Sequence, residues 1–342
     1  MHQSGDPSVS GGIVRIRHAE RAAVSHTGGA AQLESYQVFA NERNIAITSG
    51  MQQALALLNA MPLPNGKTKV VVEQPGYHLF LAHLKLHNTP ALGVERTARG
   101  VNLARLEALF KREDVRYFYT MPRFHNPLGT SLSNADKQRI VELANRYDVY
   151  IIEDDYLADF EQDAGQMPMY YDDTNQRVIY LKSYSKIMLP GLRVGVAVLP
   201  DALVGAFQQH KRTTDFDSSM ISQAALELYI TSGMFQRHRD EVRESYISNS
   251  RRLYTSLSKH AEPFLKPGTF VHPASVCMKA HIVLPNRITQ ASAAACLCGG
   301  HEGALSGELL PRENHEIECL QSGGGTDRGG RRALITDELS RA

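Results

Sequence analysis

Residues 177–200 read RVIYLKSYSKIMLPGLRVGVAVLP, two apolar runs separated by a short polar segment. The runs RVIYLKS (177–183) and GVAVLP (195–200) are short and rich in β-branched residues, which is typical of buried strands. Between them, Pro190 and Gly191 form a dipeptide that favours a turn. The sequence therefore predicts two strands joined by a loop, and that loop contains Lys186.

Upstream of this stretch, strand-like runs alternate with helix-like segments. IAITS (45–49), KVVVE (69–73), VRYFYT (115–120) and VYIIE (149–153) predict four further strands. Apolar residues at helical spacing predict helices over 51–61, 77–87, 102–112 and 133–146, and residues 201–260 are mostly helical. Strands that alternate with helices of about 10–15 residues indicate parallel pairing. We therefore predict a layered α/β fold with a mainly parallel sheet.

The composition excludes several classes of protein. Hydrophobic residues make up 42% of the 342 residues and charged residues 21%, which is typical of a globular chain. The net charge of +1 provides no basic field, so we expect no nucleic acid binding from this chain alone. No apolar run approaches the roughly 20 residues that span a bilayer, and the N-terminus lacks the apolar core of a signal peptide. We therefore expect a cytoplasmic protein with no membrane partner.

The four cysteines all follow residue 276, which is not a disulfide framework in a chain of this size. Cys296, Cys298, His301 and His315 form a cluster that could suggest a zinc site. Cys-x-Cys followed by scattered histidines is not a standard ligand spacing. No metal site is therefore predicted.

Lys186 carries the strongest chemical signal, because it follows a predicted strand where side chains become accessible. Such a lysine can form an imine with a carbonyl compound if its surroundings keep it partly neutral. Ser183 and Ser185 add hydroxyls beside it, and Arg193 adds a guanidinium. This combination suits a phosphorylated aldehyde. The alternative is an ordinary surface lysine, because a motif as short as S-x-S-K often matches by chance.

A second signal is IIEDDYLADF (151–160), which ends a predicted buried strand with three acids and a tyrosine. Carboxylates at the carboxyl edge of a parallel sheet lie where open α/β sheets bind ligands. A carboxylate there can hold a pyridinium nitrogen protonated, and a phenol two residues later can donate to a ring oxygen. The alternative is a solvated acidic strand end.

Two weaker signals suit the same ligand. TSGMQQAL (48–55) places Gly50 at a strand-to-helix junction, where free backbone N–H groups attract a phosphate. The loop PRFHNPLG (122–129) carries Asn126, an amide donor between two prolines. An ordinary turn explains either motif equally well when it is taken alone.

Taken in their order along the chain, these motifs resemble the fold-type I pyridoxal-phosphate aminotransferases over residues 45–255. VEQPGY, EDDYLADF, SYSKIMLPGLRVG and FQRHRDEVRESY are most similar to the MocR/GabR type of GntR-family regulator, whose effector domain is an aminotransferase. They are also similar to 2-aminoadipate-type aminotransferases. The resemblance implies a three-layer large domain that binds pyridoxal 5′-phosphate, a smaller C-terminal α+β domain, amino acid and 2-oxo acid substrates, and a homodimer.

The resemblance also implies a role for each residue at a matching position. Lys186 matches the lysine that bonds covalently to the cofactor and moves the substrate proton. Asp154 matches the carboxylate that pairs with the pyridine nitrogen, with the neighbouring Asp155 as an alternative. Tyr77 matches the aromatic residue that stacks on the ring. The other matches are the ring-oxygen donors Asn126 and Tyr156 and the phosphate ligands Ser49, Gly50, Met51, Gln52, Ser183, Ser185 and Arg193.

The chain departs from the family's pattern at both ends. Only 44 residues precede the first clear strand, which is too few for a winged helix–turn–helix and its linker, and no family tyrosine for the partner subunit's site is recognisable there. Residues 287–332 are rich in Gly, Ala and Cys and show neither a strand nor an arginine for the substrate carboxylate. We predict an N-terminal extension over 1–44, a large cofactor domain over 45–250, and a degenerate small domain over 251–342.

The leading interpretation is an aminotransferase that acts through Lys186 as a homodimer, with turnover slowed by the altered small domain. The alternative is a non-catalytic, cofactor-binding effector domain of a MocR-like regulator without its DNA-binding module. A third interpretation is a decayed member of the family.

Overall fold

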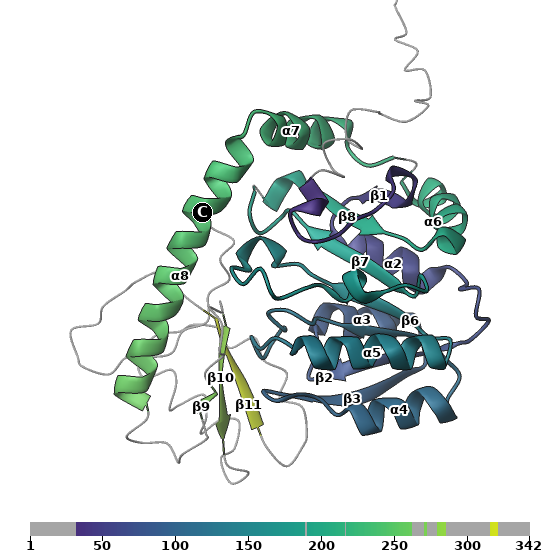
Figure 1. Ribbon diagram of the computed structural model, residues 1–342, viewed down its shortest axis with the longest axis horizontal. Coiled ribbons are helices and arrows are strands. Elements are labelled where there is room, and N and C mark those ends of the chain that lie inside the picture. The colour runs from purple at the N-terminus through teal and green to yellow at the C-terminus, as the bar shows by residue number, and fades with distance from the viewer. Residues whose placement is uncertain are drawn as a thin grey trace, which may run out of the picture.

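The computed structural model describes residues 32–188, 190–215, 217–261, 270–271, 279–284 and 315–320. An eight-stranded sheet in the order β1-β8-β7-β6-β5-β2-β3-β4 forms its centre (Figure 1). The strands are β1 (Ile45–Thr48), β2 (Lys69–Gln74), β3 (Ala91–Thr97), β4 (Gly100–Val101), β5 (Val115–Thr120), β6 (Tyr150–Asp154), β7 (Val178–Ser183) and β8 (Gly195–Val198).

Parallel pairing dominates the middle of this sheet, as predicted. The neighbours β3, β2, β5, β6 and β7 all run in one direction. Strand β8 is antiparallel to β7, β1 is antiparallel to β8, and β4 is antiparallel to β3. Because two reversals restore the original direction, β1 ends at the same edge of the sheet as β7.

The six predicted strands of this sheet are confirmed, but β3 and β4 were not predicted. In β3 (ALGVERT) only Val94 and Arg96 are buried, so the strand lacks a continuous apolar run. Its pairing with β2, rather than local sequence preference, makes it a strand.

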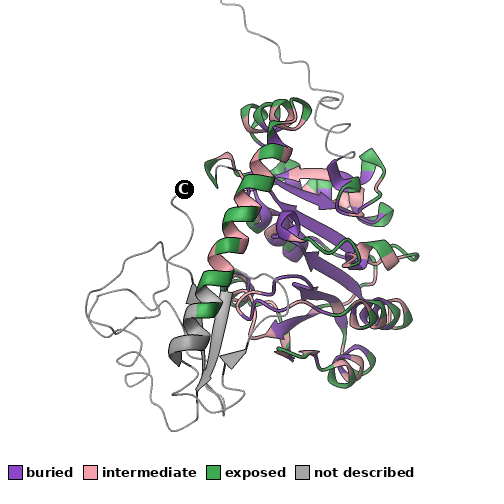
Figure 2. Ribbon diagram, turned by 60° about the vertical axis from the view of Figure 1, so that its left-hand side comes forward, coloured by how far each residue is buried: buried purple, intermediate pink, exposed green. Residues whose placement is uncertain are grey.

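Helices cover both faces of the sheet and complete the three layers (Figure 2). On one face α2 (Met51–Ala60), α3 (His78–Leu86) and α6 (Asp201–Thr214) share a core with the strands. On the other face lie α4 (Leu103–Arg112) and α5 (Asn134–Arg146). The Ser133 hydroxyl caps α5 by accepting a hydrogen bond from the backbone N–H of Asp136 at 3.1 Å, as its sequence position predicted.

A third core joins residues 32–38 to β7, β8 and the last two long helices. These helices are α7 (Met220–Thr231) and α8 (Met234–Ala261), so the predicted helical character of 201–260 is confirmed. Four 3₁₀ turns complete this part of the chain: η1 (Glu42–Asn44), η2 (Ala158–Phe160), η3 (Met169–Asp172) and η4 (Pro190–Leu192).

Beyond α8 a small antiparallel sheet has the order β11-β10-β9. It consists of β9 (Phe270–Val271), β10 (Lys279–Leu284) and β11 (His315–Leu320). The expectation that 287–332 holds no strand is therefore wrong, because β11 pairs with β10 along its whole length. Cys296, Cys298 and His301 lie outside the described residues, as do 1–31. The domain division near residue 250 stays a prediction, and α8 runs across it.

No helix in the described part of the chain is long and apolar enough to cross a bilayer. Within the same residues, no group of three or more His, Cys, Asp or Glu side chains could hold a metal ion.

Candidate active site

The carboxyl ends of the parallel strands gather most of the predicted site residues at one edge of the sheet. Gly195 in β8 pairs with Thr48 in β1 on one side and with Ser183 in β7 on the other. This register brings the turn after β1, the turn after β7 and the segment before β8 together. Along the sheet, the order of strands reverses between β5 and β2, the position where open α/β sheets bind ligands.

Lys186 lies in the turn that follows β7. Its side chain is exposed and makes no hydrogen bond or ion pair with the residues that the structure describes. The backbone N–H of Met188 donates to the carbonyl of Tyr184 at 2.9 Å and closes the turn. A lysine side chain at this edge that no described residue binds is available, in its amine form, to react with a ligand.

Arg193 lies directly against the N-terminus of α2. Gly50, the N-cap of that helix, has a φ of 85°, a conformation that favours glycine. A Cβ atom on Gly50 would lie 2.7 Å from Nη2 of Arg193, so the guanidinium packs directly on the glycine and would have to shift for a larger residue. The guanidinium and the free N–H groups of the first helical turn therefore face the same space, which suits a phosphate.

The three serines predicted to bind the phosphate differ in the hydrogen bonds that they already make within the protein. The Ser185 hydroxyl is shielded from solvent and has no hydrogen-bond partner in the described part of the chain. Ser183 Oγ accepts a bond from the backbone N–H of Ser185 at 3.2 Å. Ser49, by contrast, donates its hydroxyl to Asp215 at 3.3 Å and its N–H to Gln53 at 2.7 Å. Ser185 is therefore the best placed of the three for a new ligand.

The neighbouring residues of α2 divide between core and solvent. The Met51 side chain is buried in the apolar core, which leaves only its backbone N–H for a phosphate. The Gln52 side chain is exposed on the surface of the helix.

Asp154 ends β6 and is 2% exposed. Its Oδ2 accepts a hydrogen bond from the Tyr119 hydroxyl at 2.7 Å, whereas Oδ1 has no partner of normal geometry among the described residues. Burial raises the pKa of this carboxyl to about 7, although the bond from Tyr119 lowers it. A buried carboxylate oxygen without a partner is costly, so Oδ1 indicates a missing cationic or hydrogen-bonding ligand.

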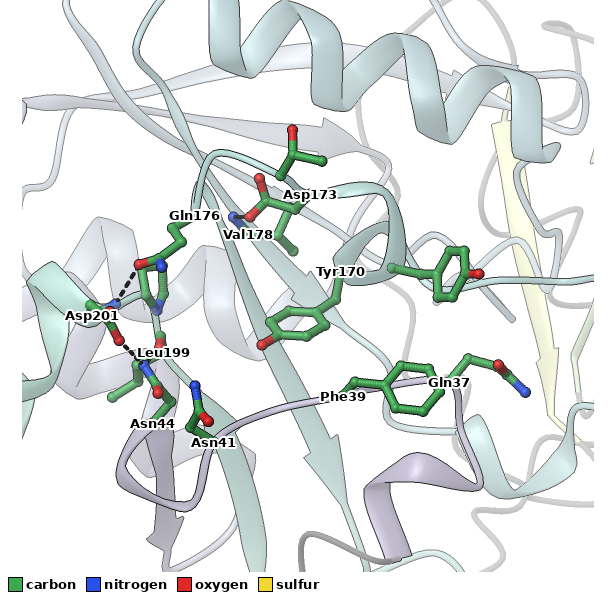
Figure 3. Close-up of a pocket in the computed structure, with 13 residues that line it drawn as sticks. Gln37, Phe39, Asn41, Asn44, Tyr170, Asp173, Gln176, Val178, Leu199 and Asp201 are labelled. Carbon is green, nitrogen blue, oxygen red and sulfur yellow. Dashed lines mark hydrogen bonds between the residues drawn. The ribbon is translucent and has the colours of Figure 1, made fainter.

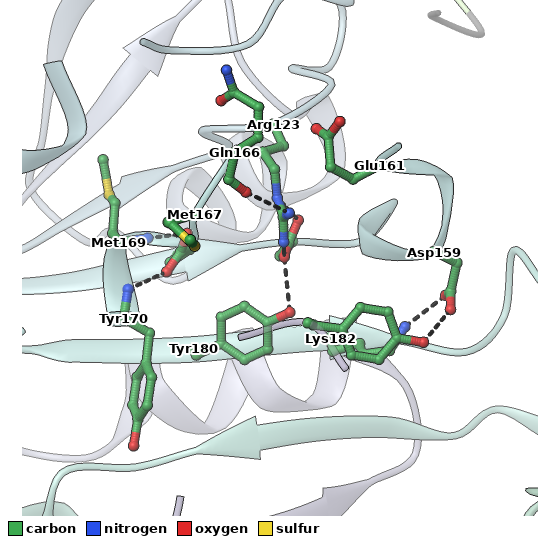
Figure 4. A network of polar contacts seen from close by, with 12 residues as sticks. Arg123, Asp159, Glu161, Gln166, Met167, Met169, Tyr170, Tyr180 and Lys182 are labelled. Carbon is green, nitrogen blue, oxygen red and sulfur yellow. Dashed lines mark hydrogen bonds and ion pairs between the residues drawn. The ribbon is translucent and has the colours of Figure 1, made fainter. Parts of the chain in front are cut away.

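Asp155, the alternative, is fully engaged by protein groups. Its Oδ1 accepts from Arg123 Nε at 3.0 Å, and its Oδ2 accepts from Arg123 Nη2 and from the Tyr180 hydroxyl (Figure 4). Both members of this ion pair are buried. Both oxygens of Asp155 are therefore bonded to side chains, whereas Asp154 has such a bond on Oδ2 alone among the described residues.

The loops after β2, β5 and β6 bring the other predicted ring contacts to this edge. The Tyr156 hydroxyl donates to the carbonyl of Phe124 at 3.0 Å, which ties the loop after β6 to the loop that carries Asn126. Tyr77 is the N-cap of α3 and is half-buried. Burial raises the pKa of Tyr119 well above its ordinary value, and Asp154 and Tyr77 both add to this shift, so Tyr77 lies near Tyr119, the residue that donates to Asp154.

Three residues of the site were not predicted. Tyr119 could have been found, because it lies on the next strand to Asp154 and near its carboxyl end. Arg123 and Asp215 gave no signal, because each acts through a contact that only the tertiary structure creates. Asp215 also accepts from Gln53 at 2.6 Å and from Lys211 at 2.8 Å.

These residues fit pyridoxal 5′-phosphate. The N-terminus of α2, with the Arg193 guanidinium against it, suits its phosphate, Asp154 Oδ1 suits its pyridine nitrogen, and the Lys186 amine is available for its aldehyde. The Ser185 hydroxyl supplies a further unpartnered group.

A cavity of about 360 Å³ lies at the opposite edge of the sheet (Figure 3). Its lining includes Phe39, Tyr170 and Tyr171, together with polar groups that are paired within the protein. Asp201 Oδ1 accepts from Asn44 at 2.7 Å, and the Asp201 N–H donates to Gln176 at 2.9 Å. None of the predicted site residues lines this cavity.

The fold is that of the fold-type I pyridoxal-phosphate-dependent transferases. A solved structure with this arrangement is the kynurenine aminotransferase of Pyrococcus horikoshii, with a TM-score of 0.74 over 86% of this chain and 74% of that one. Their sequences are 24% identical, so this likeness shows the fold alone.

The family described as "Aminotransferase class I and II" matches residues 19–298, and the chain belongs to it. An uncharacterized HTH-type transcriptional regulator of Bacillus subtilis, YcxD, is 54% identical over 253 residues, which are 74% of this chain and 57% of the regulator. The aromatic-amino-acid aminotransferase 1 of Thermococcus litoralis is 29% identical over 69% of this chain and 57% of its own. The chain thus spans somewhat more than half of the length of these relatives.

Proposed function

We propose that this chain binds pyridoxal 5′-phosphate covalently through Lys186 and transfers an amino group between an amino acid and a 2-oxo acid. The unpartnered Oδ1 of Asp154 carries the proposal. It is a buried acceptor at the carboxyl edge of the sheet, and a protonated pyridine nitrogen would satisfy it. The family assignment supports the same chemistry.

In this proposal each group at the edge has a separate task. When bound, the cofactor supplies a ring that withdraws electrons from the substrate's Cα. Asp154 in its charged form holds the ring nitrogen protonated, so binding draws its carboxyl from a pKa of about 7 toward the ionised state. Arg193 and the α2 N-terminus would hold the phosphate, and Asn126 would donate to the ring oxygen. The Tyr156 hydroxyl would do so as well once it turns away from the Phe124 carbonyl, to which it donates in the cofactor-free chain. The Lys186 amine would accept the proton from the substrate's Cα.

The proposal extends to a homodimer in the cytoplasm. On α7, Met220, Ile221 and Leu228 are 48%, 83% and 66% exposed, an apolar surface that a second copy would cover. Ile221→Glu with Leu228→Glu should then yield monomers in sedimentation velocity, whereas the unmodified chain sediments as a dimer. A monomer in both cases would contradict this part of the proposal.

The experiment that tests the proposed activity is a half-reaction with the cofactor-loaded chain. Each common amino acid is added in turn, and release of the matching 2-oxo acid is followed by mass spectrometry. We expect the unmodified chain to release the 2-oxo acid and Lys186→Met to release none. Lys85→Met is the control and should release it as well, because Lys85 is an exposed lysine on α3, away from the strand ends. Cofactor binding without release from any amino acid would contradict amino transfer and leave a binding function.

A further inference from the structure

A buried ion pair joins β7 to the turn η2, close in sequence to two residues of the proposed active site. Lys182 Nζ donates to Asp159 Oδ2 at 2.6 Å, and their side chains are 0% and 2% exposed (Figure 4). Removing two charges from water is costly, and apolar residues of similar volume often replace such a pair without loss of stability. The pair therefore needs an explanation other than stability alone.

Aromatic rings enclose the ammonium of this pair. Lys182 Nζ lies 4.2 Å from the ring centroid of Tyr36 and 4.6 Å from that of Tyr184, close enough for cation–π attraction. The Tyr36 hydroxyl donates to Asp159 Oδ1 and accepts from Gln32 Nε2 at 2.9 Å. The ammonium is thus held by one carboxylate and two ring faces that come from separate segments.

The position of the pair in the sequence connects it to the site. Lys182 is on β7, four residues before Lys186, and Asp159 is in η2, three residues after Tyr156. One bond therefore joins the turn that carries the proposed catalytic lysine to the loop that carries the proposed ring-oxygen donor.

The same turn η2 also contacts α8. Arg243 Nε donates to the backbone carbonyl of Asp159 at 2.9 Å, and the rings of Phe160 and Tyr246 meet edge to face at 4.6 Å between centroids. Tyr184 packs edge to face on Phe235 at the start of α8. Residues 32–36, η2, β7 and α8 therefore meet at Asp159.

We infer that Lys182 and Asp159 form a positioning pair for the cofactor site. The pair holds the Tyr156 loop against the Lys186 turn, and it makes the placement of both depend on the N-terminal segment 32–36 and on α8. This inference rests on the proposed function, because it assigns the pair a role through Tyr156 and Lys186.

The test uses the full chain and three variants. Lys182→Met with Asp159→Asn removes both charges and so leaves no unpaired buried ion, while Lys182→Arg keeps the charge. Arg116→Met is the matched control, since Arg116 also lies over a tyrosine ring (Tyr117, 4.9 Å) and ties a helix to a strand, by donating to the Leu58 carbonyl at 3.0 Å. Arg116 is, however, at the amino end of β5.

Three quantities are measured for each protein: hydrogen exchange of 32–38 without cofactor, the dissociation constant of pyridoxal phosphate, and the pH midpoint of the bound cofactor's absorption band. In the double variant we expect faster exchange at 32–38 and affinity weaker by about tenfold. We also expect an upward shift of the pH midpoint, because a displaced Tyr156 donates less to the ring oxygen and leaves more negative charge beside the lysine nitrogen. Lys182→Arg should restore the midpoint, and Arg116→Met should not change it.

Two other results distinguish failure of the positioning role from failure of the proposed function. A double variant whose affinity and pH midpoint equal those of the unmodified chain overturns the inference, even if it is less stable. An unmodified chain that takes no label at Lys186 on reduction with cofactor overturns the proposed function and the positioning role with it.

Discussion

The two edges of the central sheet differ in how their polar groups are satisfied. At the edge with the cavity, the carboxylate of Asp201 is paired with Arg43 and Asn44, and Asp173 accepts from the backbone N–H groups of Arg177 and Val178. At the carboxyl edge, Asp154 Oδ1 and Ser185 Oγ are shielded from water without a partner in the described part of the chain.

We infer from this difference that unsatisfied polar groups indicate the site better than empty volume does. A cavity whose carboxylates, Asp201 and Asp173, are already paired gains little at these groups from a ligand, whereas a buried acceptor without a donor gains a full hydrogen bond when one arrives. The following predictions test that contrast, from the largest expected effect to the smallest.

Asp154→Asn should mainly affect amino transfer and Asp155→Asn should mainly affect stability, although the residues are neighbours. Asp154→Asn should reduce amino transfer on the order of 100-fold, because the ring nitrogen loses its charged partner, while stability at pH 7 should not fall, because the neutral amide avoids burying a charge. Asp155→Asn should lower the free energy of unfolding by about 3–5 kcal/mol, because it leaves the buried Arg123 guanidinium without its counter-ion. Denaturant unfolding and half-reaction rates measure the two effects, and a reversed pattern would move the ring partner to Asp155.

Arg193→Met should weaken pyridoxal phosphate binding by about 10- to 100-fold, the range for loss of a charge-assisted bond. Because the Arg193 side chain is exposed, its replacement should change the free energy of unfolding little. Affinity for pyridoxal, which lacks the phosphate, serves as the control and should stay within twofold. An equal loss for both ligands would show that Arg193 does not bind the phosphate.

The cofactor-free chain should lose stability as the pH rises from 5 to 8. The pKa of Asp154 is about 7 in the folded chain, above its unfolded value, so folding favours the protonated carboxyl. The contribution of Asp154 to the free energy of unfolding is complete at low pH and is lost as the pH rises through 7. This loss corresponds to about 2 kcal/mol.

Asp154→Asn should remove this part of the pH dependence and leave the part due to Glu153, whose pKa burial also raises to about 7. Saturating pyridoxal phosphate should flatten the profile as well, because a bound cation stabilises the ionised carboxylate. Denaturant titrations at each pH measure both, and an unchanged slope in the variant would show that Asp154 does not titrate in this range.

Phe39→Ser with Tyr171→Ser should have the smallest effect. These rings are 60% and 51% exposed at the cavity edge, and none of the predicted site residues lines that cavity. Cofactor affinity should change less than twofold in an absorbance titration. A larger loss would connect the cavity edge to the cofactor and end the contrast between the two edges.

Much of this arrangement could be predicted from the sequence, because it depends on local patterns. The apolar runs of β1, β2, β5, β6, β7 and β8 predicted their strands, and parallel pairing then placed Asp154 and Ser183 at one edge. The strand β3 could not be predicted, since its sequence contains only two buried side chains.

Other parts of the site could not be predicted, because they depend on contacts between distant segments. Nothing local distinguishes Asp154 from Asp155; the difference arises because Arg123, 32 residues away, takes the second carboxylate. Likewise Ser49 meets Asp215 across 166 residues, and Lys182 meets Asp159 across 23. Only the tertiary structure shows which groups remain without a partner.

The most direct test of the central claim is to reduce the chain with borohydride in the presence of pyridoxal phosphate and to map the labelled peptide by mass spectrometry. Lys186 is exposed at the carboxyl edge, whereas Lys182 is buried in its ion pair and Lys211 is bound to Asp215. The proposal predicts one phosphopyridoxyl label, on Lys186, and its loss in Lys186→Met. A label on Lys182 or Lys211, or no specific label, would contradict it.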